Sequence, residues 1–415
     1  MDKILTKKIQ IQLSDYFSNA THMHKPEIRA MRDMVLGILK SKSVFVNQIA
    51  ASLREPLKLK NIAKRLSAQY LKADYADNLL EYHLSKTTPG VSTESFILMD
   101  GTDISKKHAK FMEGLEFVKN GDTGNIGLGY NVLNITAINN HKEITPLYSK
   151  AYSYEMGALS SNNEIKKAVT QVNTHLKNKG CWVFDRGADS AILKDFFFEQ
   201  STKCIIRLKR NTKLTYKAKE LTVSQIAKSM NFTFSQTITK IKKNKPVRKT
   251  YDLGAVRVHY NNSILWLVVS RDQKHGGLCY LLVKSALTCP IEVAKWAFKG
   301  YGLRWKIEEY HRHIKQEYKL ENIQIKTFAG LQSMLVLLTV AMNIIYKKIK
   351  SLHIDLLLDA GYNYLNKHHI RELTNFIYYK ISKIVAILLM PTKSRWKAQK
   401  TPLMDDDMQL NFQFN

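Results

Sequence analysis

Three widely separated carboxylates could together perform metal-assisted phosphoryl chemistry. Asp100 ends the short apolar run 96–99. Asp185 ends the apolar run 181–184 in the same way, and Glu308 lies far downstream in a segment with helical spacing. Ligands that offer only oxygen suit Mg²⁺ or Mn²⁺, which also take waters and substrate phosphate oxygens. Two such ions about 4 Å apart can activate an attacking oxygen and steady a leaving oxygen in an in-line displacement.

Glu308 belongs to segment 301–315, which is expected to form one continuous helix. No Gly or Pro follows Gly302, and apolar residues recur there at helical spacing. A second, charged stripe lies about 100° further round the helix. Its members are Arg304, Glu308, His311 and Lys315. On a lone helix such a stripe is more typical of a solvated salt-bridge face, so the rest of the chain must decide whether it forms a site.

The elements expected around the two aspartates follow a recognisable order. They are strands 96–99, 130–138 and 143–148, helix 164–177, strand 181–184, helix 191–199 and strand 203–208. Three strands, helix, strand, helix, strand is the order of a ribonuclease-H-like fold, an α/β architecture with helices on both faces of a mixed sheet. In that fold the first and fourth strands are neighbours, so Asp100 and Asp185 would lie side by side. An Asp at a strand end is otherwise often only a turn residue.

A turn-rich segment of alternating pattern interrupts this core. Residues 210–285 predict a β-rich insertion, with expected strands at 233–240, 255–260, 264–270 and 278–283. The basic stretch 240–249 within it is either a phosphate-contacting loop or a solvated tip. Helical spacing returns at 292–299 and continues in 301–315.

These patterns divide the chain into five regions. We expect a basic helical DNA-binding region at 1–92, the core at 93–209 and 289–350, the insertion at 210–288 and a helical C-terminal region at 351–415. The expected N-terminal helices are 28–40, 46–53 and 59–71; the expected C-terminal ones are 332–350 and 371–389. Pro56 separates two of the N-terminal helices, which allows a short helix-turn-helix. A helical bundle that only packs on the core is the alternative.

Composition favours a polyanionic partner. The chain has 415 residues, with 64 Lys plus Arg against 35 Asp plus Glu and a formal charge of +29. Such an excess of positive charge would destabilise the folded state by self-repulsion unless a bound polyanion offsets it. Nucleic acid is the commonest such partner. No cysteine pair has C-x-x-C spacing, which argues against a zinc site. Without an apolar secretory signal, and with the apolar run 334–346 too short for a bilayer, the expected setting is the cytoplasm.

The chain resembles DDE transposases of the IS4 type. That family carries a Y-(2)-R-(3)-E-(6)-K signature, which this chain matches without departure. The matching residues are Tyr301, Arg304, Glu308 and Lys315. The family's first aspartate motif resembles D-G-T-D-I at 100–104, and its second resembles V-F-D-R at 183–186. A β-rich insertion before the glutamate is also a family feature, and the resemblance covers about residues 96–345.

The resemblance implies a reaction and its cofactor. A transposase of this type cleaves DNA at the terminal inverted repeats of an insertion sequence and transfers the 3′-hydroxyl ends into target DNA, by a cut-and-paste route. Asp100, Asp185 and Glu308 would be the catalytic residues and would hold two Mg²⁺ ions, for which Mn²⁺ can substitute. Asp103 is the alternative to Asp100 as ligand, although the strand end and the family motif favour Asp100. A homodimer across two DNA ends is also implied.

The resemblance further implies contacts with DNA. Tyr301, Arg304 and Lys315 would grip phosphates of the element end, and Arg186 would either do likewise or pair with a carboxylate. Some family members form a hairpin intermediate and hold a flipped base against a tryptophan of the insertion. Trp266 occupies a matching place, and a core tryptophan on a strand is the alternative.

Other functions fit the same residues less well. A ribonuclease-H-like nuclease or resolvase would cut DNA without joining it. A non-catalytic DNA-binding derivative would not need all three carboxylates. A structural RNA-binding protein would explain the charge but not the carboxylates.

Overall fold

The computed structural model describes residues 2–18, 23–106, 108–109, 111–121, 123–199, 203–242, 245–353, 355 and 377–390. The C-terminal helix predicted at 371–389 lies partly outside the described residues, which include only its part α14 (Ile377–Leu388).

One large mixed sheet organises the molecule, and five of its strands form the part predicted as the core. These strands lie in the order β4-β3-β1-β5-β6. Their bounds are β1 (Phe96–Ser105), β3 (Ile126–Ile138), β4 (Ile144–Tyr152), β5 (Cys181–Phe184) and β6 (Lys203–Arg207). β1 is antiparallel to β3 and parallel to β5. The prediction that the first and fourth of the expected strands are neighbours is therefore confirmed.

The register of β1 against β5 brings the two aspartates together. The parallel pairing runs from Phe96 opposite Cys181 to Leu98 opposite Val183. The same register, continued for two residues, sets Asp100 opposite Asp185. β1 itself is longer than predicted, because β3 pairs with it as far as Ser105. Asp100 therefore lies within a strand, and the prediction that it ends the strand is wrong.

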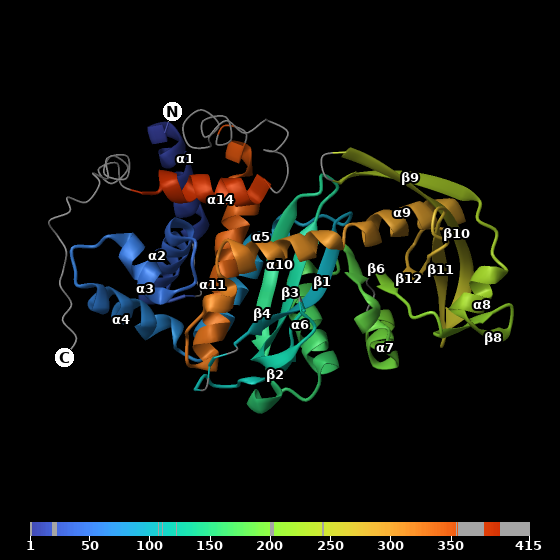
Figure 1. Ribbon diagram of the computed structural model, residues 1–415, viewed down its shortest axis with the longest axis horizontal. Helices are drawn as coiled ribbons and strands as arrows, with labels where there is room; N and C mark the ends of the chain where they lie inside the picture. Colours follow the sequence, from blue (N-terminus) through green and yellow to red (C-terminus); the bar gives the residue numbers. More distant parts are fainter. Residues whose placement is uncertain are drawn as a thin grey trace, which may run out of the picture.

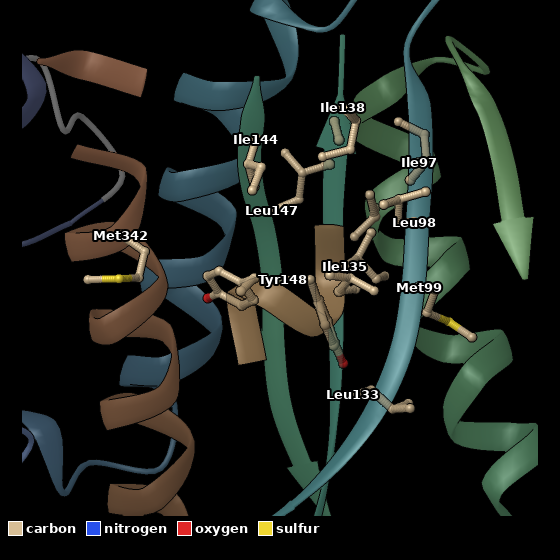
Figure 2. Packing of buried hydrophobic residues seen from close by; sticks show 14 of the residues in the cluster. Ile97, Leu98, Met99, Leu133, Ile135, Ile138, Ile144, Leu147, Tyr148 and Met342 are labelled. Carbon is tan, nitrogen blue, oxygen red and sulfur yellow. The ribbon is translucent and has the colours of Figure 1, made fainter. Parts of the chain in front are cut away.

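Buried side chains on both faces of these strands form the core. Ile97 and Leu98 are fully buried, as are Ile135 and Leu147 on the neighbouring strands. Figure 2 shows these side chains between the strands and their covering helices, with Met342 of α11 beyond β4. The covering helices include α6 (Ser161–Leu176), α7 (Ala191–Glu199) and α11 (Phe328–Asn343). α11 packs on β4 and on α5 (Tyr75–Thr87).

The apolar helix around α11 is longer than the sequence suggested. With the π-helical turn that follows, Ile344–Lys348, it spans Phe328–Lys348 and is long and apolar enough to cross a membrane by length and composition alone. The apolar run 334–346 is therefore only the middle of a longer helix. Because 83% of its most apolar window is buried inside the protein, it serves as a core helix, between the sheet and the N-terminal helices (Figure 1).

The insertion continues the same sheet. Its strands are β7 (Lys213–Tyr216), β8 (Lys219–Thr222), β9 (Phe234–Lys242), β10 (Lys245–Tyr260), β11 (Ser263–Asp272) and β12 (Leu278–Lys284). β12 pairs with β6 of the core, and α8 (Val223–Lys228) completes the region. Most of the basic stretch 240–249 lies in the β9–β10 hairpin instead of a loop. In Figure 1 the insertion and the N-terminal helices lie at opposite ends of the molecule.

The N-terminal region is helical, as expected. It consists of α1 (Asp2–Phe17), α2 (Lys25–Ser41), α3 (Val46–Leu53), α4 (Leu59–Tyr70) and α5. α2 packs against α3, α4 and α11. The region is therefore a bundle attached to the core, and the segment around Pro56 joins α3 to α4 as predicted. A short strand, β2 (Glu116–Lys119), was not predicted and pairs with β3.

Candidate active site

The segment that carries the charged stripe is two helices instead of one. α9 (Pro290–Gly302) ends at Gly302, and α10 (Trp305–Gln316) begins three residues later. Arg304 is the residue that precedes the first turn of α10. The prediction of one continuous helix over 301–315 is therefore wrong, and Tyr301 belongs to a different helix from Glu308.

The guanidinium of Arg304 joins two of the three carboxylates. Its Nη1 donates to Oδ2 of Asp100 at 3.0 Å, and its Nη2 donates to Oε1 of Glu308. Asp100 and Arg304 are both largely shielded from solvent, whereas Glu308 is about half exposed. Arg304 thus connects Glu308 of α10 with Asp100 of β1, across more than two hundred residues of sequence.

Asp185 completes the cluster from the end of β5. Its Oδ1 accepts the backbone N–H of Gly187 at 2.7 Å, so the carboxylate also caps the short turn that follows the strand. The pKa of Asp100 is raised to about 6: burial is the main cause, the charges of Asp185 and Glu308 add to the rise, and the charge of Arg304 opposes it. The same three carboxylates raise the pKa of Arg304 against the effect of its burial. The four side chains therefore share one electrostatic environment.

The three carboxylates suit a hard divalent cation, but the guanidinium of Arg304 already contacts two of them. Carboxylate oxygens are what Mg²⁺ and Mn²⁺ prefer, and a cation would relieve the repulsion that raises the pKa of Asp100. Within the described residues, no three His, Cys, Asp or Glu side chains lie close enough to hold a metal as they stand. The arginine already pairs with Asp100 and Glu308, so a metal ion would compete with it for their oxygens.

Lys315 lies at the other end of α10 and pairs with Asp103. Its Nζ lies 3.2 Å from Oδ1 of Asp103 and 3.2 Å from Oε1 of Glu321. The backbone N–H of Gly121 and the side chain of Asn120 also donate to the Asp103 carboxylate. Asp103 is buried and fully occupied by these donors. This geometry favours Asp100 over Asp103 as the carboxylate available to a metal.

Tyr301 contacts a residue that the sequence analysis did not single out. Nη1 of Arg207, at the end of β6, donates to the Tyr301 hydroxyl at 3.1 Å, and the guanidinium lies 5.7 Å from the ring centroid. Burial raises the pKa of Tyr301, and the charge of Arg207 opposes that rise. Arg207 is thus a further cation beside the signature tyrosine. Only its position at a strand end, next to that of Asp185, could have suggested it.

The remaining predicted DNA contacts differ in their surroundings. Arg186 is exposed immediately after Asp185. Trp266 is only 4% exposed, and its indole N–H donates to the carbonyl of Leu287. The Cζ atom of Arg257 covers the ring, 3.8 Å from its centroid. This arrangement fits a core tryptophan, and base stacking would require the ring to be uncovered. By contrast Trp305, at the start of α10, is 45% exposed beside Arg304, although the sequence analysis gave it no role.

Two histidines of α10 lie inside the protein. His313 contacts the hydroxyls of Tyr346 at 2.8 Å and Ser382 at 3.1 Å, which fastens the back of α10 to the helices behind it. His311 is more than nine-tenths buried, and its Nε2 has no hydrogen-bond partner among the described residues. Burial lowers the pKa of His311 to about 3, with Lys315 and Arg304 adding to the effect. Both imidazoles are therefore neutral at physiological pH.

One comparison with known proteins bears on these residues. The sequence model of a family described as the transposase DDE domain matches residues 92–344, which is more than half of the chain. The match begins just before β1 and ends after α11, so it includes all three carboxylates and the insertion. No curated protein matches the chain.

Proposed function

The chain belongs to the transposase DDE domain family, and on this premise we propose that it is the DNA transposase of a bacterial insertion sequence, of the IS4 type. It would cleave DNA at the terminal inverted repeats and transfer the 3′-hydroxyl ends into target DNA by a cut-and-paste route. The observation that carries the proposal is the pairing of Arg304 with both Asp100 and Glu308, with Asp185 near enough to affect the pKa of Asp100 and of Arg304. Enzymes of this family cleave DNA with the help of divalent metal ions.

The sheet supports a ribonuclease-H-like core for this activity. The strand order β4-β3-β1-β5-β6, with β1 antiparallel to β3 and parallel to β5 and β6 parallel to β5, agrees with that fold. In support of this core, Asp100 lies on β1, Asp185 directly follows the adjacent strand β5, and Glu308 lies on α10. We propose that residues 93–209 and 289–350 form this core around the insertion at 210–288, with the helical regions 1–92 and 351–415 outside it.

The carboxylates supply the ligands in the proposed mechanism. Asp100, Asp185 and Glu308 would hold two Mg²⁺ ions, which supply a Lewis acid for the scissile phosphate and an activated oxygen nucleophile. With a pKa of about 6, Asp100 is largely ionised at neutral pH and can serve as a ligand. Arg304 would first release the carboxylates and then turn to the phosphate, because a planar guanidinium can donate two parallel hydrogen bonds to the oxygens of either group.

Other cations of the site would hold the DNA end. Tyr301 donates a hydrogen bond to a phosphate once Arg207 has shifted, and Lys315 contributes charge at the far end of α10. Arg186, which is exposed beside Asp185, has free access to the backbone of the scissile strand. The net charge of +29 supplies the general attraction for DNA. A homodimer would hold two ends at once, in the cytoplasm, where the element's DNA lies.

The proposal is tested with DNA that carries the element's flanking inverted repeats, a target plasmid and Mg²⁺. Joined products are expected, and cut ends without joining would favour a nuclease of the same fold. D100A, D185A and E308Q should each abolish cutting and leave DNA binding largely intact. Glu309→Gln is the matched control, because Glu309 is the adjacent carboxylate and pairs with Lys306 at 3.0 Å instead of with Arg304. Cleavage by E308Q at the wild-type rate would refute the assignment.

A further inference from the structure

A groove of about 930 Å³ opens next to the candidate active site. Its walls come from three separate parts of the chain. Phe45 lies at the start of α3, His108 and Phe111 follow β1, and Lys319 and Lys326 follow α10. The groove therefore lies where the N-terminal helical region meets the core.

Two side chains connect this groove to the charged stripe of α10. Asn120 and Glu321 both line the groove. Asn120 donates to Asp103 at 3.3 Å, and Glu321 pairs with Lys315 at 3.2 Å. The groove thus begins where the stripe Arg304–Glu308–His311–Lys315 ends, and a DNA strand that passes Lys315 would enter it.

The lining combines cations with an exposed aromatic ring. Phe111 is 85% exposed, and Lys319 and Lys326 are also exposed. Lys106 is committed to the fold, because its ammonium donates to the carbonyls of Glu321 and Ile323. Burial lowers its pKa to about 8. Lys319, Lys326 and the ring of Phe111 are therefore the exposed groups of the lining that a ligand can contact.

This combination fits unpaired nucleotides better than a duplex. Aromatic rings bind nucleic acid by stacking on base faces, which are accessible in single strands and covered in a duplex. Lysines beside the ring track the phosphates of the same strand. A volume of about 930 Å³ is in the range of pockets that enclose small ligands. It is thus matched to a few nucleotides.

We propose that this groove binds unpaired nucleotides of the DNA strand next to the cleavage site. The bases stack on Phe111, and Lys319 and Lys326 contact the phosphates. This inference rests on the proposed function for the identity of the DNA, but the binding itself does not require cleavage.

The test compares two DNA probes without divalent metal. One is a blunt duplex; the other is the same duplex with a single-stranded extension of about six thymidines, within the site size of known single-strand grooves. Fluorescence anisotropy should show tighter binding of the extended probe by the wild-type protein. Phe111→Ala should reduce that preference about tenfold, the loss expected for one stacked base. Because Phe111 is almost fully exposed, this substitution leaves the fold unchanged.

Phe117→Ala is the matched control, since Phe117 is 78% exposed on β2 and does not line the groove. Replacing Lys319 and Lys326 together by alanine should lower the slope of log affinity against log salt by about 1.4 for the extended probe, since each single-strand phosphate contact contributes ~0.7. An equal affinity of the wild type for both probes, or an unchanged preference in Phe111→Ala, would overturn the proposal.

A second measurement separates this inference from the proposed function. An extension carrying 5-iodouracil should crosslink to Phe111 on irradiation, in protein that has no metal and cannot cut. If the wild type neither cuts nor joins DNA yet crosslinks at Phe111, the groove proposal stands and the transposase proposal fails. If the wild type joins DNA but does not crosslink at Phe111, the transposase proposal stands and the groove proposal fails.

Discussion

In the absence of a ligand, Arg304 is the side chain that pairs with the carboxylates of the candidate site. Its guanidinium pairs with both Asp100 and Glu308 and lies near Asp185. A buried carboxylate left without a cation is costly, so the arginine stabilises the cluster in the absence of metal. The same contact means that a metal ion must compete with an internal cation for the same oxygens.

We predict that Arg304→Ala binds Mn²⁺ more tightly than the wild type but cleaves DNA more slowly. Removing the guanidinium frees two carboxylates for the metal, and it also removes the proposed phosphate contact. Isothermal titration calorimetry in the absence of DNA should show that the affinity for Mn²⁺ rises about tenfold. A tenfold change is the effect of an interaction that shifts a pKa by about one unit. Arg312→Ala serves as control on the same helix. Weaker Mn²⁺ binding by Arg304→Ala would show that the arginine assists the metal instead of competing with it.

His83 makes the stability of the folded protein depend on pH. Its Nε2 donates to the carbonyl of Pro146 at 2.9 Å, and its Nδ1 accepts the hydroxyl of Tyr16 at 2.8 Å. Burial lowers the pKa of His83 to about 4, from 6.5. Between these two values the unfolded chain binds the proton and the folded chain does not. Stability is therefore complete above pH 6.5 and falls as the pH drops towards 4.

We predict a loss of stability on the order of 3 kcal/mol from His83 across that window. Urea denaturation at several pH values should show the free energy of unfolding decreasing with acidity. His83→Gln, which can keep both hydrogen bonds and does not titrate, should flatten the curve. The buried His311 and His313 contribute in the same direction. An identical pH dependence in His83→Gln would contradict the assignment.

At the level of elements, a single glycine allows α9 to pack closely on the sheet. A Cβ at Gly300 would lie 2.3 Å from Cε1 of Phe96 and 2.9 Å from Cδ1 of Ile205. These are core side chains of β1 and β6. The helix can therefore approach the strands only because residue 300 has no side chain. That approach also fixes Tyr301, the next residue, beside Arg207.

We predict that Gly300→Ala destabilises the fold by about 2 kcal/mol, the usual cost of overpacking a core. Gly302→Ala is the control, because a Cβ there meets no atom within 4 Å. Since alanine favours a helix more than glycine does, Gly302→Ala should be neutral or stabilising. Thermal denaturation of both variants gives the comparison. Equal melting temperatures would mean that α9 has room to move away from the sheet.

Some elements could be predicted from the sequence and others could not. The helices Val46–Leu53 and Ala191–Glu199 and the strand Cys181–Phe184 were predicted to the residue, because apolar spacing and turn residues bound them clearly. The break between α9 and α10 left no such signal: Leu303 and Arg304 keep helical backbone angles. The ion pair between Arg304 and Asp100 joins residues 204 positions apart and depends on the whole sheet, so spacing could not reveal it.

At the level of the molecule, the core and the insertion share one hydrogen-bonded sheet. β12 pairs with β6 over four residues of each strand, from Leu281 opposite Arg207 to Lys284 opposite Cys204. α9 packs on β10 and β11 of the insertion and on β5 and β6 of the core. The insertion is therefore part of the structural support for the helix that carries Tyr301.

We predict that deleting residues 213–284 abolishes soluble expression. The deletion would expose the edge of β6 and remove β10 and β11, on which α9 packs, and open edges promote aggregation. Shortening only the β9–β10 hairpin, by removing residues 239–248, is the control, since in that stretch the two strands pair with each other. Soluble protein from the full deletion would show that the insertion is an independent unit.

The contact between His313 and Ser382 also bears on the order of synthesis. His313 lies on the helix that carries Glu308, and Ser382 lies on α14, the last described helix. During translation all three carboxylates leave the ribosome well before residue 382 does. A nascent chain therefore has every ligand of the site while the hydroxyl of Ser382 is still missing behind α10. The packing behind α10 is complete only once α14 has been synthesised, so a message cut short before residue 382 yields the three carboxylates without this contact.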